Sequence, residues 1–226
     1  LTVITQYRTG EQRLHLGGDF VGSTAAGETG LHFVIGDVSG HGPDAAALGA
    51  TLRSTWKALV LSGASILEAV DGMGKMLITE KAESTVFATI VAGLVDVAAS
   101  EVSLVNAGHL PPLLIADGTV CTLESEPGSP LGFDGGRPRT LHRFALPERW
   151  SLFLYTDGLI DARLAPGSQQ RYGETRLRER LGAWIGTTPD TGALAVLLGE
   201  IETGSGGPFA DDVAVLLISP KNGAAG

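Results

Sequence analysis

Four aspartates share a position that suits the binding of a metal ion: each lies at the mouth of an apolar strand-like segment. Asp19 follows Gly17-Gly18, Asp37 closes the segment 31–35, Asp157 closes the segment 151–155, and Asp211 precedes the segment 213–218. Carboxylates at strand ends can converge on one edge of a sheet, and such a cluster repels itself unless cations neutralise it. The pattern therefore predicts a cation site.

The chemistry of the ligands indicates which cation to expect. Only oxygen ligands are offered, without the His and Cys spacing of a zinc site, so Mg²⁺ or Mn²⁺ is expected. Two such ions about 3.5–4 Å apart, bridged by water, generate a hydroxide for in-line attack on a phosphoryl group. A glycine beside an aspartate lets the backbone approach a ligand closely. A single Asp-Gly is usually a turn, so the prediction depends on the four occurring together.

Seven short motifs contain or accompany these aspartates. In chain order they are Gly17-Gly18-Asp19-Phe20, Gly36-Asp37-Val38-Ser39-Gly40-His41-Gly42, Phe87-Ala88-Thr89, Asn106-Ala107-Gly108-His109, Pro130-Leu131-Gly132, Tyr155-Thr156-Asp157-Gly158-Leu159 and Asp211-Asp212-Val213-Ala214. The ordered set resembles the SpoIIE/RsbU branch of the metal-dependent PPM phosphatases, which are relatives of protein phosphatase 2C. The resemblance covers residues 14–218. Each motif alone is weak, whereas the ordered set is strongly specific.

The resemblance implies both a fold and an activity. The fold is α+β, a β-sandwich of two antiparallel sheets flanked by helix pairs. The activity is Mn²⁺- or Mg²⁺-dependent hydrolysis of phosphoserine or phosphothreonine by a hydroxide that bridges two ions. The substrate is a regulatory protein, often an anti-sigma-factor antagonist. The alternative is a pseudophosphatase, a module of the same fold that binds phosphoproteins without turnover.

The resemblance also implies roles for individual residues. Asp37 would bridge both ions, and the Val38 carbonyl and Asp19 would take further positions. Asp157 and Asp211 would complete the other ion site. Three neighbours could support these ligands: Gly18, Gly158 and Asp212. The sequence does not separate the role of Asp212 from that of Asp211.

Two departures from the family pattern affect these expectations. The branch often follows Gly-Gly-Asp-Phe with an aromatic residue and another Asp, where this chain has Val21 and Gly22, which argues against an accessory metal site. Protein phosphatase 2C has a His two residues after its bridging Asp, proposed as general acid, whereas this chain has Ser39 there and His41 two residues later. His41 either protonates the leaving serine oxygen or belongs to the turn before the next helix.

The surrounding pattern predicts the elements that position these residues. Helices are expected from Pro43-Asp44 onward, from a Ser65–Glu68 capping box onward, and over 174–185 and 191–201. Residues 85–123 read as an antiparallel meander with a hairpin at Asp117-Gly118, followed by a loop over 126–139. In the loop motif around His109, a turn residue that bonds the backbone is favoured over a catalytic base.

Composition excludes several classes of function. The 226 residues carry a formal net charge of −9, which argues against nucleic acid or anionic membrane as partners. The single cysteine, Cys121, fits a cytoplasmic protein.

We expect one phosphatase domain over residues 1–220 with a disordered tail over 221–226. Because the chain begins at Leu1, regulatory domains are expected elsewhere in a longer protein, and a homodimer is left open.

Overall fold

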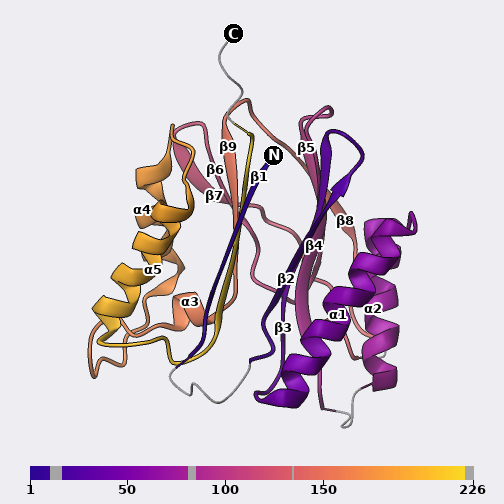
Figure 1. The fold of residues 1–226 in the computed structure, drawn as a ribbon, viewed down its shortest axis with the longest axis horizontal. Helices are drawn as coiled ribbons and strands as arrows, with labels where there is room; N and C mark the ends of the chain where they lie inside the picture. Colours follow the sequence, from indigo (N-terminus) through magenta and orange to yellow (C-terminus); the bar gives the residue numbers. More distant parts are fainter. Residues whose placement is uncertain (11–16, 81–84, 134, 222–226) are drawn as a thin grey trace. The chain divides into compact units, whose positions relative to one another are not determined.

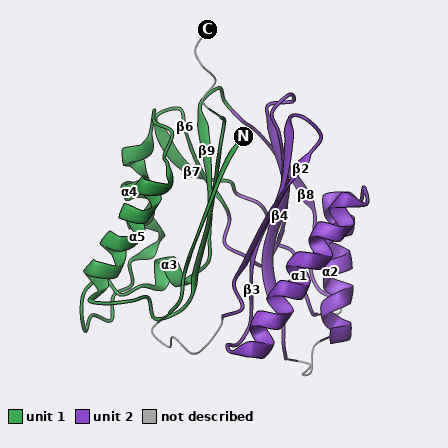
Figure 2. Cartoon of the chain, in the orientation of Figure 1, with its two compact units in different colours: residues 1–13, 112–123, 147–226 green, residues 14–111, 124–146 purple. Residues whose placement is uncertain are grey.

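The chain forms two compact units, each built on one five-stranded antiparallel sheet with helices packed against it. The computed structural model describes residues 1–10, 17–80, 85–133 and 135–221. Unit 1 comprises residues 1–13, 112–123 and 147–226, and unit 2 comprises residues 14–111 and 124–146 (Figures 1 and 2). Antiparallel strands and helices occur in separate runs along the chain, which makes the fold α+β.

The sheet of unit 2 has the strand order β2-β3-β4-β5-β8, with every neighbouring pair antiparallel. Its strands are β2 (Phe20–Ala26), β3 (Gly30–Val38), β4 (Ala88–Asp96), β5 (Glu101–Ala107) and β8 (Leu141–Ala145). Helices α1 (Pro43–Leu61) and α2 (Ile66–Glu80) pack on each other and on this sheet. The expected strand over 31–35 is thus part of a longer strand that includes Asp37.

Both helices of unit 2 begin where the sequence predicts. Pro43 occupies the first turn of α1 and Asp44 adds negative charge there, which favours the positive end of the helix dipole. At α2 the Ser65 N–H donates to Glu68 Oε2 over 2.8 Å, and the Glu68 N–H donates to Ser65 Oγ over 3.3 Å. This reciprocal pair is the predicted capping box.

The core of unit 2 lies between the helices and one face of the sheet. Trp56 of α1, Met73 of α2 and Val34 of β3 belong to one cluster of buried apolar side chains and are at most 1% exposed. Burying an aliphatic or aromatic side chain of this size contributes about 1.5–3 kcal/mol. This packing holds α1, and therefore the loop before it, against β3.

The sheet of unit 1 has the strand order β1-β10-β9-β6-β7, again antiparallel throughout. Its strands are β1 (Thr2–Arg8), β6 (Leu113–Ala116), β7 (Thr119–Thr122), β9 (Trp150–Tyr155) and β10 (Val213–Ser219). Its helices are α3 (Gly158–Asp161), α4 (Gly173–Leu181), the short 3₁₀ helix η1 (Gly182–Trp184) and α5 (Thr191–Ser205). Every residue of the two strands β9 and β10 is buried.

The hairpin between β6 and β7 has the predicted two-residue turn. Asp117 has φ 49° and Gly118 has φ 77°. Two successive residues with positive φ are typical of the type I′ turn, whose twist matches that of the flanking strands.

The prediction of one meander over 85–123 is wrong. Strand β5 pairs with β4 and β8 in the sheet of unit 2, whereas β6 pairs with β7 and β9 in the sheet of unit 1. Between β5 and β6 the chain passes from the sheet of unit 2 to the sheet of unit 1, and β8 pairs with β5 instead.

The sequence analysis did not anticipate strands β1, β2 and β8 or the single-turn helix α3. The loop over 126–139 is confirmed for its described residues.

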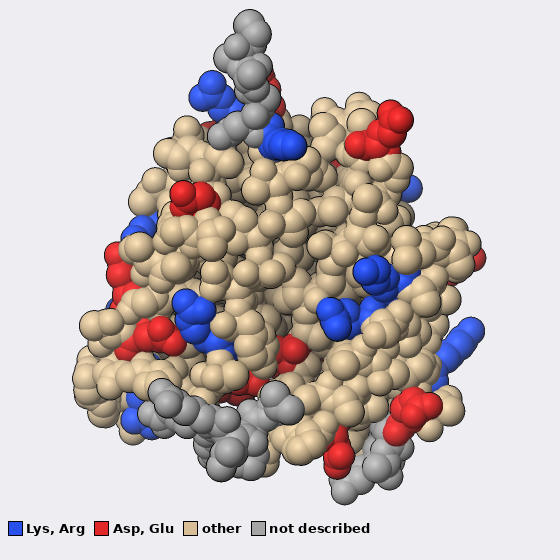
Figure 3. Space-filling model, in the orientation of Figure 1, with Lys and Arg blue, Asp and Glu red and all other residues tan. Residues whose placement is uncertain are grey.

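Some expectations remain predictions. A single domain over residues 1–220 is one of them, and residues 222–226 of the expected tail lie outside the described residues. In the described part of the chain, no helix is both long and apolar enough to span a membrane. On the face shown in Figure 3, basic and acidic side chains are interspersed over a mainly uncharged surface.

Candidate metal centre

In unit 2, the backbone brings the segments that contain Asp19 and Asp37 together. Asp37 is the next-to-last residue of β3, and Asp19 directly precedes β2. The Val38 N–H donates to the Gly18 carbonyl over 3.3 Å, and Gly17 forms an isolated bridge with His41. Both aspartates are partly exposed. Five predicted site residues therefore lie in this one region: Gly18, Asp19, Asp37, Val38 and His41.

Gly18 is required by this arrangement. A Cβ atom at this position would overlap the carbonyl oxygen of Val38 and would lie 2.9 Å from the Val38 Cβ. The Val38 carbonyl is the group that the family resemblance assigns to a metal ion. The absence of a side chain at Gly18 thus lets the backbone of the Asp19 segment lie directly against this carbonyl.

Ser39 holds the loop between β3 and α1 in place. Its N–H donates to the Phe87 carbonyl over 2.9 Å, and its Oγ accepts from the Phe87 N–H over 3.0 Å. Protein phosphatase 2C has its proposed general acid at this position. In this chain the Ser39 hydroxyl is already engaged with Phe87, so its role is structural. His41 is exposed in the same loop, and its role as proton donor stays a prediction.

In unit 1, Asp157 lies where β9 ends and α3 begins, and it is the N-cap residue of that helix. Its side chain reaches solvent, but the surrounding protein removes part of its hydration. This burial raises the pKa of the Asp157 carboxyl, and the negative charges of Asp211 and then Asp161 raise it further. The negative charge of Asp211 therefore acts on the Asp157 carboxyl.

The structure separates the two neighbouring aspartates before β10. The Asp212 side chain is 7% exposed, and both of its oxygens are engaged: Oδ2 accepts from the Tyr7 hydroxyl over 2.6 Å and Oδ1 accepts from the Gly10 N–H over 2.8 Å. Asp211 is exposed, and its Oδ1 accepts from the Asp212 N–H over 2.8 Å. Asp212 therefore fastens the end of β1, and Asp211 is the one of the two that presents a carboxylate to solvent.

Gly158 allows close contact between the ends of β9 and β10. A Cβ atom at this position would overlap the carbonyl oxygen of Asp212. Beside it, the Thr156 N–H donates to the Ala214 carbonyl over 3.1 Å, and the Ala214 N–H donates to Thr156 Oγ1 over 2.9 Å. The glycine and the threonine of this motif thus bring the Asp157 segment next to the Asp211-Asp212 segment.

Comparison with known protein families decides what this set of motifs is. The family model described as Stage II sporulation protein E (SpoIIE) matches residues 27–221, which is most of the chain. The chain belongs to the SpoIIE family. This is a family of serine phosphatases of the PP2C type, generally dependent on metal ions.

Two bacterial proteins are similar to this chain along much of its length. The chain is 29% identical over 195 residues to Protein IcfG of Synechocystis and 27% identical over 149 residues to the phosphoserine phosphatase RsbP of Bacillus subtilis. These alignments include 74% and 65% of this chain. The chain spans about a third of the length of these relatives, 30% of IcfG and 37% of RsbP.

Solved structures confirm the fold class. The RsbU and RsbW domains of Rv1364c from Mycobacterium tuberculosis match with a TM-score of 0.82 and 26% identity, over 99% of this chain and 60% of that one. The SiaA-PP2C domain of Pseudomonas aeruginosa matches with a TM-score of 0.81 and 18% identity, over 97% of this chain and 86% of that one. The α+β prediction of two antiparallel sheets with helices is therefore confirmed.

Because the SpoIIE family generally depends on metal ions, the predicted ligand residues should be able to bind divalent cations. Among the described residues, no group of three or more His, Cys, Asp and Glu side chains is arranged to hold a metal ion by itself. The donors present nevertheless fit Mn²⁺ or Mg²⁺, which prefer carboxylate and carbonyl oxygens. In unit 1 a cation would offset the negative charge of Asp211 that raises the pKa of the Asp157 carboxyl. In unit 2 the glycine at position 18 lets the backbone next to Asp19 lie directly against the Val38 carbonyl.

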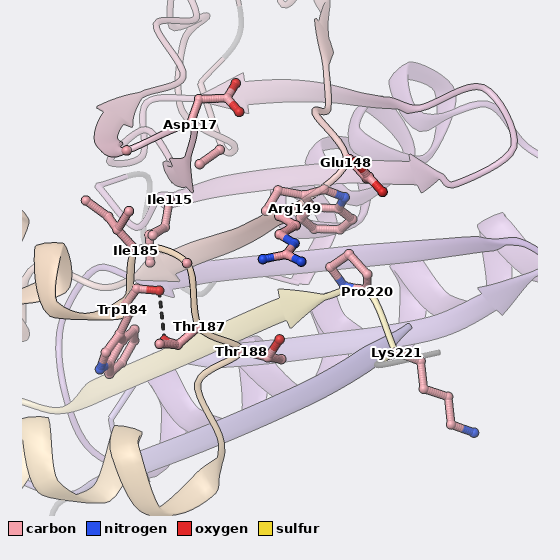
Figure 4. Close-up of a pocket in the computed structure, with 14 residues that line it drawn as sticks. Ile115, Asp117, Glu148, Arg149, Trp184, Ile185, Thr187, Thr188, Pro220 and Lys221 are labelled. Carbon is pink, nitrogen blue, oxygen red and sulfur yellow. Dashed lines mark hydrogen bonds between the residues drawn. The ribbon is translucent and has the colours of Figure 1, made fainter. Parts of the chain in front are cut away.

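Unit 1 contains a pocket of about 770 Å³ (Figure 4). Its lining includes Trp150 at the start of β9 and Pro220 directly after β10. Asp157 lies at the other end of the six-residue strand β9, roughly 20 Å away along an extended chain. None of the predicted site residues lines this pocket, so it is not part of the candidate metal centre.

The sequence analysis missed one residue beside this centre. Thr89 of β4 is paired directly with Asp37 of β3. Its hydroxyl is 2.8 Å from Nδ1 of His109, which the sequence analysis interpreted as a turn residue that bonds the backbone. Thr89 and His109 both lie in motifs that the sequence analysis quoted, Phe87-Ala88-Thr89 and Asn106-Ala107-Gly108-His109. Neither motif reveals the pairing of β3 with β4, which places Thr89 opposite Asp37.

Proposed function

We propose that this chain is a metal-dependent protein phosphatase that hydrolyses phosphoserine or phosphothreonine on a regulatory protein, of the anti-sigma-factor antagonist type. The observation that carries the proposal is that each unit places carboxylates at strand ends beside a glycine, Gly18 or Gly158, where a Cβ atom would overlap the carbonyl oxygen of a neighbouring segment. The relationship to the phosphoserine phosphatase RsbP supports the reaction class.

The proposed ligands come from the two sets of acidic residues. Asp37, Asp19 and the Val38 carbonyl in unit 2, and Asp157 and Asp211 in unit 1, would hold two Mn²⁺ or Mg²⁺ ions. When bound, such ions activate water and screen the charge of the phosphoryl group. Asp212 is excluded from this set because both its oxygens already accept hydrogen bonds from β1 and the segment after it.

Two residues of the loop that follows Asp37, Ser39 and His41, have different proposed roles. Ser39 fixes the loop through its two hydrogen bonds to Phe87, so that the Asp37 carboxylate and the Val38 carbonyl keep their positions. His41, exposed in that loop, would donate a proton from its imidazolium to the departing Oγ of the substrate serine. A water oxygen forms a new bond to phosphorus as the P–O bond to Oγ breaks, and the proton that the water releases balances the one that His41 donates. The products are the free hydroxyl group of the substrate and inorganic phosphate.

The substrate and setting are proposed from the relatives. The matching Mycobacterium tuberculosis structure contains RsbU and RsbW domains together. We therefore propose that the substrate is a phosphoprotein that works together with an RsbW-type domain. We also propose that regulatory domains lie in the same longer protein and that the chain acts in the cytoplasm. The single cysteine supports a reducing compartment.

The test compares hydrolysis of p-nitrophenyl phosphate in millimolar Mn²⁺ and in EDTA. We expect a rate that requires the metal and is abolished in Asp37→Asn, which keeps the shape of the side chain but removes its charge. Asp96→Asn, on the same sheet at the far end of β4, is the matched control and should retain the rate. A metal-independent rate, or one that survives Asp37→Asn, would refute the proposal. Binding of phosphoprotein without turnover would establish the pseudophosphatase instead.

A further inference from the structure

A buried hydrogen-bonded network in unit 2 ends beside Asp37, a proposed metal ligand. Asp37 and Thr89 face each other across the antiparallel pair of β3 and β4. Directly opposite residues project from the same face of a sheet, with Cβ atoms about 4.5–5.5 Å apart. Thr89 is therefore the residue of β4 whose side chain lies next to that of Asp37.

The orientation of the Thr89 side chain is set by His109. Thr89 Oγ1 lies 2.8 Å from His109 Nδ1. The His109 side chain is buried, with 8% of its surface exposed. A β-branched side chain has few χ1 rotamers, and this hydrogen bond selects one of them. The threonine thus has a fixed hydroxyl and a fixed methyl group on the face that carries Asp37.

His109 is itself held by a reciprocal pair of hydrogen bonds. Its N–H donates to Asn106 Oδ1 over 2.9 Å, and Asn106 Nδ2 donates to the His109 carbonyl over 3.0 Å. Asn106 is 2% exposed, at the end of β5. Between them Gly108 has φ 75°, and a Cβ atom there would lie 2.7 Å from Pro130 Cγ. The motif Asn-Ala-Gly-His therefore builds a rigid support for one imidazole ring.

The backbone next to Thr89 is fixed as well. The Ala88 N–H donates to the Leu131 carbonyl over 3.1 Å, and the Leu131 N–H donates to the Ala88 carbonyl over 2.8 Å. Ala88 and Leu131 are both fully buried. Three of the seven sequence motifs, those around Thr89, His109 and Leu131, thus converge on the strand position opposite Asp37.

We propose that Thr89 and His109 are positioning residues that hold the Asp37 carboxylate in the orientation needed to bind its metal ions. The inference rests on the proposed function, because it takes Asp37 as a metal ligand. Groups that orient a metal ligand change metal affinity or activity, typically by 10- to 100-fold when they are removed. Nothing about the reaction itself is assigned to His109, which acts through Thr89.

The competing explanation is that the network only closes the loop after β5. In that case its loss would lower stability and leave the affinity for metal unchanged. The chain offers a control for this distinction, because Asn106 Nδ2 also donates to Ser125 Oγ over 3.4 Å. Ser125 belongs to the same buried network but has no hydrogen bond to Thr89 or His109 among those of the described residues.

The experiment measures Mn²⁺ affinity of the 226-residue chain by titration, following free Mn²⁺ by electron paramagnetic resonance. Thr89→Val keeps the shape of the side chain and removes the hydroxyl, and we expect it to weaken Mn²⁺ binding about 10-fold. Thr89→Ser restores the hydroxyl and should recover most of that loss. Thr89→Val combined with His109→Phe should cost little more than Thr89→Val alone, because residues that act as a unit are not additive.

Each outcome decides something. Ser125→Ala should lower the melting temperature and leave Mn²⁺ affinity unchanged. If Thr89→Val does the same, positioning is refuted while hydrolysis by the unsubstituted chain still supports the proposed function. If the unsubstituted chain binds Mn²⁺ without hydrolysing p-nitrophenyl phosphate, only the proposed function fails. If it does not bind Mn²⁺, both proposals fail.

Discussion

The carboxylate of Asp212 accepts a hydrogen bond from the hydroxyl of Tyr7, 2.6 Å away and 205 residues earlier in the chain. With the second bond from the Gly10 N–H, it fastens the end of β1 to the start of β10. Its neighbour Asp211 has no such task and presents its carboxylate to solvent. Two adjacent residues of one type therefore have different jobs, which mutation can separate.

We predict opposite effects for substitutions at these two positions. Asp212→Ala leaves the buried Gly10 N–H without its acceptor, so the metal-free protein should lose about 1–3 kcal/mol of unfolding free energy. Asp211→Asn should leave that free energy nearly unchanged and weaken Mn²⁺ binding. Urea unfolding in EDTA and Mn²⁺ titration measure the two quantities. Tyr7→Phe, which removes a single hydrogen bond to Asp212, should be less destabilising than Asp212→Ala.

The reverse result would contradict this assignment. If Asp211→Asn destabilised the metal-free protein and Asp212→Ala mainly weakened Mn²⁺ binding, Asp212 would be the ligand. The resemblance to the family alone does not distinguish the two, because both residues lie in the same motif.

The substitution Gly18→Ala tests whether the backbone contact at Val38 shapes the site. The added methyl group would overlap the Val38 carbonyl oxygen, and the obstacle is backbone rather than a flexible side chain. The segments of Asp19 and Asp37 would have to separate, so we expect weaker Mn²⁺ binding together with a loss of stability. Overpacking of this kind typically costs 1–3 kcal/mol.

A matched glycine substitution provides the control for Gly18→Ala. Gly199 lies within α5, and a Cβ atom there would meet nothing within 4 Å. Gly199→Ala should therefore raise the unfolding free energy by about 0.5–1 kcal/mol, since alanine is the better helix former, and leave Mn²⁺ affinity unchanged. Wild-type Mn²⁺ affinity in Gly18→Ala would show that the close contact at Val38 is dispensable.

The sequence predicted the strand ends that carry the aspartates because their cause is local. The segments that precede Asp37 and Asp157 and follow Asp211-Asp212 are mainly apolar, and central strands buried on both faces have that pattern. The edge strand β7 was predicted from its hairpin turn, but the edge strands β1, β2 and β8 have no comparable signal. Strand β8 alternates between exposed and half-buried residues over only five positions, which is why residues 141–145 were not recognised.

Other features of the site depend on contacts between distant residues. The pairing of Asp37 with Thr89 requires the register of β3 on β4 across an intervening helix pair, and register is set by which face is buried. The difference between Asp211 and Asp212 depends on Tyr7 and Gly10, at the opposite end of the chain. The motif order identified the family, but it contained no information about these pairings.

The capping box of α2 gives a prediction about pH. Glu68 Oε2 accepts from the Ser65 hydroxyl over 2.7 Å and from the Ser65 N–H over 2.8 Å. These bonds, the hydroxyl first, lower the pKa of the Glu68 carboxyl. Because the folded pKa lies below the unfolded one, the stabilisation is complete above the unfolded pKa and is lost as the pH falls through the folded pKa.

Ser65→Ala should therefore lower the melting temperature at neutral pH, and the difference from the unsubstituted chain should shrink in acid as Glu68 becomes protonated. Thermal unfolding in EDTA from pH 7 to pH 3 measures this, since EDTA removes any contribution of bound metal. Glu68→Gln keeps a neutral acceptor and should abolish the pH dependence of the difference. A difference that stays constant across this range would show that the charge of Glu68 contributes nothing to the cap, and that the Ser65 hydroxyl acts alone on the Glu68 N–H.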